Sequence, residues 1–250
     1  MEDKGVATLD RALAILATFS EAEPLLSLAE LSRRTGLYKS TLLRLLASLQ
    51  HWHFVGQRQD GQYHVGPAAL HLARLYQRSI RPAELIHEAI VAVAAEVVEN
   101  VNFYVRRGEA RVCVDCVPSP HAIRHHTLVG EIFPLQRGAA GRVLCAFSDD
   151  LSSAALEPVR KAFACVSHGE YVENLSAVSV PVFGADNQCE GAIAVTGLSA
   201  RFTDERIAFF LRQLRQASIK LSRALGADNA LLQTFEAALD APAPPTPASA

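Results

Sequence analysis

The sequence of 250 residues, with a mass of 27.0 kDa, is long enough for one or two domains. Half of its residues are hydrophobic, which excludes disorder as a description of the whole chain. The formal net charge is only −2, from 24 Lys and Arg against 26 Asp and Glu. A nucleic-acid or membrane partner would therefore have to be bound by a local basic patch.

The composition predicts a cytoplasmic protein without a membrane-spanning segment. Its apolar stretches, such as residues 90–98, are interrupted by acidic residues and fall short of the roughly 20 apolar residues that a span needs. The N-terminal sequence MEDKGVATLD lacks the positive charge and apolar run of a secretion signal. An odd number of scattered cysteines is typical of reduced thiols; they are Cys113, Cys116, Cys145, Cys165 and Cys189.

The N-terminal region has the pattern of three helices. Apolar residues at helical spacing predict an amphipathic helix over residues 8–19. A short second helix is expected in SLAELSRR, where Ser27 and Glu30 have the spacing of a capping box. Gly36 can take the left-handed conformation that ends a helix, and a third helix is expected over residues 38–50. Two helices joined by such a turn predict a helix-turn-helix.

The third of these helices has an apolar side and a polar side. At about 100° per residue, a set of leucines falls within one arc. They are Leu42, Leu45, Leu46 and Leu49. The opposite arc carries Ser40, Arg44 and Ala47, and Lys39 and Thr41 flank it. A surface of hydroxyls, cations and a small residue suits insertion into the major groove of DNA.

A β-hairpin is expected next, in HFVGQRQDGQYHVG, because Asp60-Gly61 is a dipeptide that supports tight turns. A hairpin that follows a helix-turn-helix is typical of a winged helix. Between Leu25 and Arg58 five cations stand against one acid. This segment therefore provides the local basic patch that the overall charge does not.

The rest of the chain alternates between helical and strand patterns, which indicates an α+β domain after a connecting helix. The expected elements are helices at 68–77 and after Pro82, a hairpin around Arg107-Gly108, a helix at 138–147, an amphipathic stretch at 151–163, strands at 177–183 and 191–197, and a helix at 203–225. The expected domains are a winged helix at 1–66, a linker helix at 67–81, a second domain at 82–227, and a helix remnant with a disordered Ala/Pro tail at 228–250.

Several segments carry a family resemblance. In the first domain they are LDRALAIL, LAELSRRTGLYKSTLLRLLASL and YHVGPAALHLA. In the second they are VGEIFPLQRGAAGRVLCAF and HGEYVENLSAVSVPVFGADNQCEGAIAVTGLSARFT. Together they resemble the IclR family of bacterial transcriptional regulators, from residue 6 to about 225. The resemblance implies an α+β fold with a winged helix, a linker helix and a GAF-like effector-binding domain whose sheet is mixed or antiparallel.

The resemblance also implies partners. Members of the IclR family bind double-stranded operator DNA as homodimers or dimers of dimers, and their second domain binds a small-molecule effector. The implied effector-binding residues are Ala139, Ala140, Gly141, Ser167, Glu170, Ala177, Ser179, Ala194 and Thr196. Alanine at 177 and 194 leaves a very small acid few polar partners, which favours a bulkier, aromatic one. No cofactor, metal or catalytic residue is expected, so the protein is not expected to be an enzyme.

The predicted DNA-binding residues have different roles. Arg44 is the best candidate for a base contact, because a guanidinium can donate two hydrogen bonds to guanine. Lys39 is expected at a phosphate, and Arg58 at the backbone or the minor groove. Ser27 caps its helix and can lie near a phosphate at that helix N-terminus. The whole set is Ser27, Lys39, Ser40, Thr41, Arg44 and Arg58.

Two other groups of residues are of types that bind metals or undergo redox chemistry. Cys113 and Cys116 lie three apart in a strand pattern, so their side chains should point to opposite faces and the thiols are expected to be structural. His121, His125 and His126 are of a type that binds zinc. They are expected to lie in a solvated loop instead.

Two other functions fit the sequence. The second domain could be a redox or enzymatic domain that uses Cys113 and Cys116, with the winged helix as a docking module. The winged helix could also contact proteins only. Removing both cysteines should abolish activity in the first case, and the absence of salt-dependent duplex binding would indicate the second.

Overall fold

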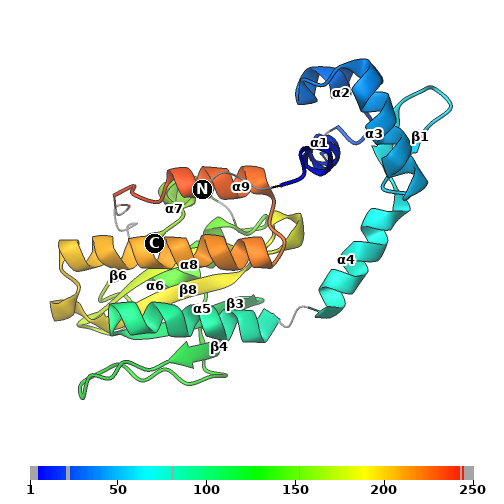
Figure 1. Ribbon diagram of the computed structural model, residues 1–250. Coiled ribbons are helices and arrows are strands. Elements are labelled where there is room, and N and C mark those ends of the chain that lie inside the picture. Colours follow the sequence, from blue (N-terminus) through cyan, green and yellow to red (C-terminus); the bar gives the residue numbers. More distant parts are fainter. Residues whose placement is uncertain (1–4, 21–22, 80–81, 152, 243, 245–250) are drawn as a thin grey trace. The chain divides into compact units, whose positions relative to one another are not determined.

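The computed structural model describes residues 5–20, 23–79, 82–151, 153–242 and 244. The chain forms two compact units, Met1–Ile80 and Arg81–Ala250 (Figure 1). Each unit is described separately below. The predicted disorder of the Ala/Pro tail falls mainly on residues outside the described part. Among the described residues, no helix is both long and apolar enough to cross a membrane.

The first unit is a winged helix, as predicted. Its elements in chain order are α1 (Ala7–Leu16), α2 (Leu28–Thr35), α3 (Lys39–His51), β1 (Val55–Gln57), β2 (Tyr63–Val65) and α4 (Pro67–Ser79). Strands β1 and β2 pair antiparallel. Its core contains Leu31 of α2 and Leu42 and Leu46 of α3, all of them almost completely buried.

The turn between α2 and α3 forms for the reasons that the sequence indicates. The Ser27 hydroxyl accepts a hydrogen bond of 3.2 Å from the backbone N–H of Glu30, which caps α2. Gly36 ends α2 with a φ of 69°, which few other residues adopt without strain. The second half of the predicted capping box is replaced, because the Glu30 carboxylate accepts hydrogen bonds from Arg33 and Arg34 instead.

Helix α1 differs from the prediction in length and in burial. It ends at Leu16 rather than near residue 19. The apolar stripe is divided, because Ile15 is fully buried while Leu9 and Leu13 are 56% and 53% exposed. The described residues of the first unit therefore leave part of this stripe uncovered.

The second unit contains an antiparallel six-stranded sheet with the order β5-β4-β3-β8-β7-β6. The strands are β3 (Asn100–Arg107), β4 (Ala110–Val117), β5 (Ile132–Pro134), β6 (Cys165–His168), β7 (Leu175–Phe183) and β8 (Cys189–Leu198). The helices are α5 (Pro82–Val97), α6 (Gly138–Ala146), α7 (Glu157–Ala162), α8 (Asp204–Ala224) and α9 (Asn229–Ala237). The α+β class predicted for the chain is confirmed.

The two faces of this sheet carry side chains of different size. On β8, Ile193 and Val195 pack into the large core formed with α5, α8 and α9, whereas Ala192 and Ala194 pack towards α6. Figure 1 shows α5 and α8 side by side over the first of these faces. Because successive strand residues point to opposite faces, this alternation separates a core of large residues from a face of small ones. The small side chains leave room beneath α6.

A β-bulge at Val114 shows that the predicted orientation of two cysteines was wrong. Cys113 pairs with Tyr104 and Cys116 pairs with Asn102, and these partners lie two apart on β3. The extra residue therefore places both thiols on one face of the sheet. Burial raises the pKa of Cys113 to about 12 and also raises the pKa of Cys116. Neither thiol is thus prone to ionise at neutral pH.

Candidate functional site

The polar side of α3 forms an exposed surface. Lys39, Ser40 and Arg44 are exposed and Thr41 is half-buried, while the leucines on the opposite side are buried. Within the described part of the chain, neither Lys39 nor Arg44 forms a salt bridge with an acidic side chain. Both cations are therefore available to bind an anion.

The other cations of the basic patch are less available. Arg33 and Arg34 both pair with Glu30, at 2.5 Å and 3.1 Å. These two guanidinium groups lower the pKa of the Glu30 carboxyl to about 2. Arg58, in the loop between β1 and β2, lies 3.9 Å from the Asp60 carboxylate, and both side chains are about half exposed. The uncompensated positive charge of the patch is thus concentrated on α3.

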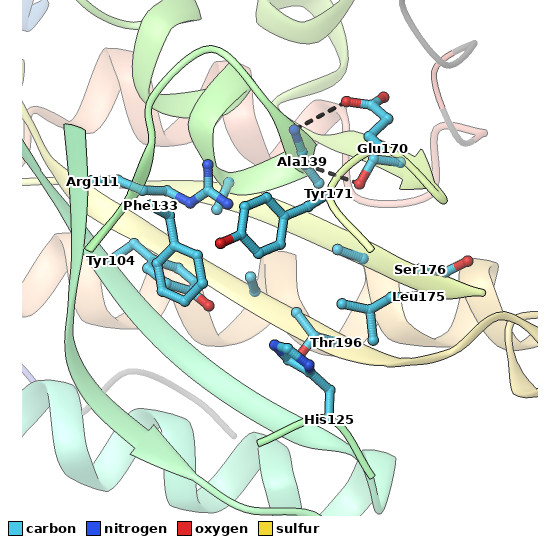
Figure 2. A pocket seen from close by; sticks show the side chains of 15 residues that line it. Tyr104, Arg111, His125, Phe133, Ala139, Glu170, Tyr171, Leu175, Ser176 and Thr196 are labelled. Carbon is cyan, nitrogen blue, oxygen red and sulfur yellow. Dashed lines mark hydrogen bonds between the residues drawn. The ribbon is translucent and has the colours of Figure 1, made fainter. Parts of the chain in front are cut away.

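A pocket lies on the small-residue face of the sheet in the second unit (Figure 2). Its volume is about 40 Å³, space for only a few water molecules at roughly 10–15 Å³ each. The lining residues come from β3, β4, β5, β6, β7, β8, the start of α6 and two loops. They are Tyr104, Arg111, His125, Phe133, Gly138, Ala139, Ala140, Ser167, Glu170, Tyr171, Leu175, Ser176, Ala177, Ala194 and Thr196.

Most of the residues predicted for effector binding line this one pocket. Those that do are Ala139, Ala140, Ser167, Glu170, Ala177, Ala194 and Thr196. Gly141 and Ser179 do not line it. Gly141 packs so closely on the carbonyl of Leu135 that a Cβ there would overlap it. The Ser179 hydroxyl is buried and donates a hydrogen bond of 2.9 Å to the carbonyl of Ile193.

The first backbone amides of α6 are held by side chains of the chain itself. The amide of Gly138 donates to the Glu170 carboxylate at 3.0 Å, and the amide of Ala139 donates to the Ser167 hydroxyl at 3.0 Å. Arg142, one turn into α6, pairs with Glu170 at 3.2 Å. A helix N-terminus is a natural anion site, and here Glu170 occupies it.

Arg111 on β4 is a pocket residue that the sequence did not indicate. It is only 6% exposed. One of its terminal nitrogens donates to the carbonyls of Pro134 and Arg137, while its Nε has no hydrogen-bond partner. The guanidinium carbon lies 5.4 Å and 5.2 Å from the ring centres of Tyr104 and Phe133. Among the described residues, no carboxylate lies within salt-bridge distance of it.

The positive charge of Arg111 is therefore buried without an acidic partner among the described residues. Burial lowers the pKa of its guanidinium, although Tyr104 and Glu170 counteract this effect in part. A buried charge is costly unless it is paired. A buried cation that lines a cleft, with no acidic partner among the described residues, is a candidate functional residue.

Tyr171 and His125 are two further pocket residues that sequence reasoning missed. The Tyr171 ring lies beside Arg111 and packs edge-on against Phe133 at 5.4 Å (Figure 2). His125 was expected in a solvated loop, but it is partly buried and lines the pocket. The Asn100 amide fixes this loop by donating to the His125 carbonyl at 2.6 Å. Local sequence carries no signal of these contacts, because all of them join distant segments.

These two units define a class of protein. A winged helix whose third helix exposes cations without a salt bridge among the described residues is suited to DNA, and a separate unit with a buried, cation-containing pocket is suited to a small ligand. Residues 8–59 match the IclR helix-turn-helix domain, and residues 77–157 and 149–223 match the bacterial transcriptional regulator IclR C-terminal domain. The chain belongs to the IclR family, whose members are transcriptional regulators rather than enzymes.

Individual relatives agree with this assignment. The chain is 24% identical over 243 residues to the HTH-type transcriptional regulator KipR of Bacillus subtilis, across 88% of this chain and 97% of the relative. It is 23% identical over 250 residues to the transcriptional repressor IclR of Escherichia coli, across 88% and 90%. An IclR-type regulator from Silicibacter sp. TM1040 has the same fold, with a TM-score of 0.79 at 23% identity across 89% and 97%.

Proposed function

We propose that this IclR-family regulator binds operator DNA through α3 and the β1–β2 wing, and that an organic acid, preferably an aromatic one, is its effector. The observation that supports the choice of effector most directly is the buried Arg111 guanidinium, which lies against aromatic rings and has no acid partner in the part of the chain that the structure describes. A cation in an apolar pocket favours a ligand that combines a negative charge with an apolar body. We place the protein in the cytoplasm, where its DNA is.

For DNA, we assign base recognition to Arg44 and phosphate contacts to Lys39, with Ser40 and Thr41 beside them. The exposure of this surface supports the assignment, as does the lack of a salt bridge to either cation among the described residues. Arg58 extends the contact to the backbone or the minor groove, and the α2 N-terminus capped by Ser27 lies near a phosphate. Each protomer contributes one recognition helix.

A symmetric assembly of the protein matches a palindromic operator, whose two half-sites are related by a two-fold axis. We propose a homodimer, or a dimer of dimers, that reads two half-sites spaced by about one helical turn or a multiple of it. The exposed apolar residues of α1, Leu9 and Leu13, and the preceding Val6 support a contact between copies, because such residues are usually covered.

The effector acts by binding two states of the second unit with different affinity. Ser167 and Glu170 at the pocket edge contact the first turn of α6, so a ligand there can alter these contacts. We propose that α4 transmits the change to the winged helix. A coupling of about 1–3 kcal/mol between the two ligands is typical of such regulators.

The proposal is tested by two measurements on the purified full-length protein. A panel of aromatic and aliphatic acids is screened for thermal stabilisation, since a ligand that binds only the native state raises its unfolding temperature. DNA selected from a random-sequence pool is then titrated at several salt concentrations, with and without the stabilising acid. We expect steeply salt-dependent binding that the acid changes. Absence of specific duplex binding in both conditions would refute the proposal.

A further inference from the structure

The loop between β6 and β7 places two side chains of the chain itself in the pocket. This loop, residues 169–174, is closed at its base by a hydrogen bond of 2.8 Å from the Gly169 amide to the Leu175 carbonyl. Gly169 and Asn174, at its two ends, both have left-handed backbone conformations, with φ of 65° and 63°. Glu170 and Tyr171 project from it over the pocket (Figure 2).

The two side chains occupy different parts of the site. The Glu170 carboxylate holds the start of α6 through the Gly138 amide and Arg142. The Tyr171 ring covers the pocket next to Phe133 and Arg111, and the residue remains 40% exposed. The part of the pocket at the start of α6 is thus filled by a carboxylate, and the part beside Phe133 and Arg111 is filled by an aromatic ring.

The remaining space is too small for an aromatic ligand. Pockets for small molecules usually measure roughly 300–1,000 Å³, whereas this one measures about 40 Å³. The nearest movable group of the right shape is the Tyr171 ring, because its other face is towards solvent. Moving it outward would free the volume of one six-membered ring against Phe133 and beside Arg111.

The electrostatics indicate where the acid group of such a ligand would bind. The amides of Gly138 and Ala139 already have acceptors, and Arg142 already has Glu170, so the α6 N-terminus offers little to a second anion. Arg111 offers an unpartnered Nε in a buried position. Hydrogen bonds between a guanidinium and a carboxylate are among the strongest in proteins, and more so when shielded from water.

We propose that Arg111 is the carboxylate-binding residue of the pocket and that Tyr171 is a built-in occupant, whose ring the aromatic ring of the effector displaces. The inference rests on the proposed function, because it takes this pocket as the effector site. It adds the two side chains that select such an acid, and the displacement of one of them by the ligand.

Benzoate is the probe for a ring with an acid group, benzamide is its neutral counterpart, and acetate is an acid without a ring. We expect the full-length protein to bind benzoate more tightly than benzamide or acetate in calorimetric titrations. In Arg111→Met we expect benzoate affinity to fall by about thirtyfold or more, since a buried charge pair is lost, and the preference over benzamide to disappear. The matched control Arg107→Met removes an exposed cation of the same unit and should leave benzoate binding unchanged.

The second variant tests displacement. In Tyr171→Ala we expect benzoate to bind more tightly and associate faster, because the ring no longer has to move, whereas Tyr171→Phe should behave like the original protein. Weaker benzoate binding in Tyr171→Ala would overturn the displacement step. Because the benzoate to benzamide ratio compares two ligands on one variant, it remains valid if Arg111→Met lowers stability.

The outcomes separate this inference from the proposed function. If an organic acid changes operator binding but its affinity does not depend on Arg111, the proposed function stands and the inference is wrong. Equal binding of benzoate and benzamide by the original protein would also overturn the inference. Absence of specific operator binding both with and without the acid concerns the proposed function alone, because benzoate binding is measured on the protein without DNA.

Discussion

Replacing Arg44 by alanine tests the central contact of the proposed DNA complex. The Arg44 side chain is exposed and has no ion pair within the described residues, so its removal should cost the folded protein little. A bidentate contact between arginine and guanine is worth about 1–3 kcal/mol of discrimination. The expected loss of operator affinity is therefore roughly 5- to 150-fold.

Two other variants serve as references for Arg44→Ala. Lys39→Ala removes a proposed phosphate contact, so it should weaken binding to all sequences and lower the salt dependence by about one unit of slope. Arg33→Ala removes the same charge as Arg44→Ala from a side chain that already pairs with Glu30. Its effect on operator affinity should be small.

The assay is fluorescence anisotropy with the selected operator and a scrambled duplex, at several salt concentrations. Arg44→Ala should lower the ratio of specific to non-specific affinity, whereas Lys39→Ala should preserve that ratio. Circular dichroism and thermal unfolding would check that each variant is folded. If Arg44→Ala binds the operator as tightly as the original protein, the assignment of this residue to a base edge is refuted.

Three further predictions concern the pocket, the assembly and the cysteines. Thr196→Val should weaken binding of the stabilising acid about fivefold, the equivalent of one hydrogen bond, without changing DNA binding in its absence; an unchanged dissociation constant would remove Thr196 from the site. Leu13→Glu should dissociate the proposed dimer in analytical ultracentrifugation, because it places a charge in the exposed stripe of α1; an unchanged mass would exclude this surface. Burial raises the pKa of Cys113 and Cys165 from 9.0 to about 12, so the native state keeps these protons at pH values where the unfolded chain releases them. The free energy of unfolding should therefore fall as the pH rises above about 9, and substitution of either cysteine by alanine should reduce this slope.

The local structure of the winged helix could be predicted from sequence because its signals are local. Ser27, Gly36 and the leucines of α3 act within a few residues of one another, and the helices form where they indicate. The burial of α1 could not be predicted in the same way. Its spacing shows that the helix has an apolar stripe, but only the packing of the unit determines that Ile15 is buried and Leu13 is exposed.

The pocket was predicted in part, through the residues that the family resemblance supplied. Arg111 was missed because an arginine in an alternating strand usually faces solvent. Its burial depends on the carbonyls of Pro134 and Arg137, more than twenty residues away. The orientation of Cys113 and Cys116 was wrong because a single bulged residue reverses the faces of a strand, and the sequence does not mark it.

The division of the sheet into a large-residue face and a small-residue face has a consequence for retuning the protein. Ala177 and Ala194 line the pocket, whereas their neighbours Val178 and Val195 belong to the opposite core. Under the proposed function, a larger or polar side chain at either position should change which molecule is bound, while the core on the opposite face keeps its residues. Substitutions at these two positions are thus a starting point for biosensors that respond to other compounds. Natural relatives can diverge in effector specificity through the same few substitutions.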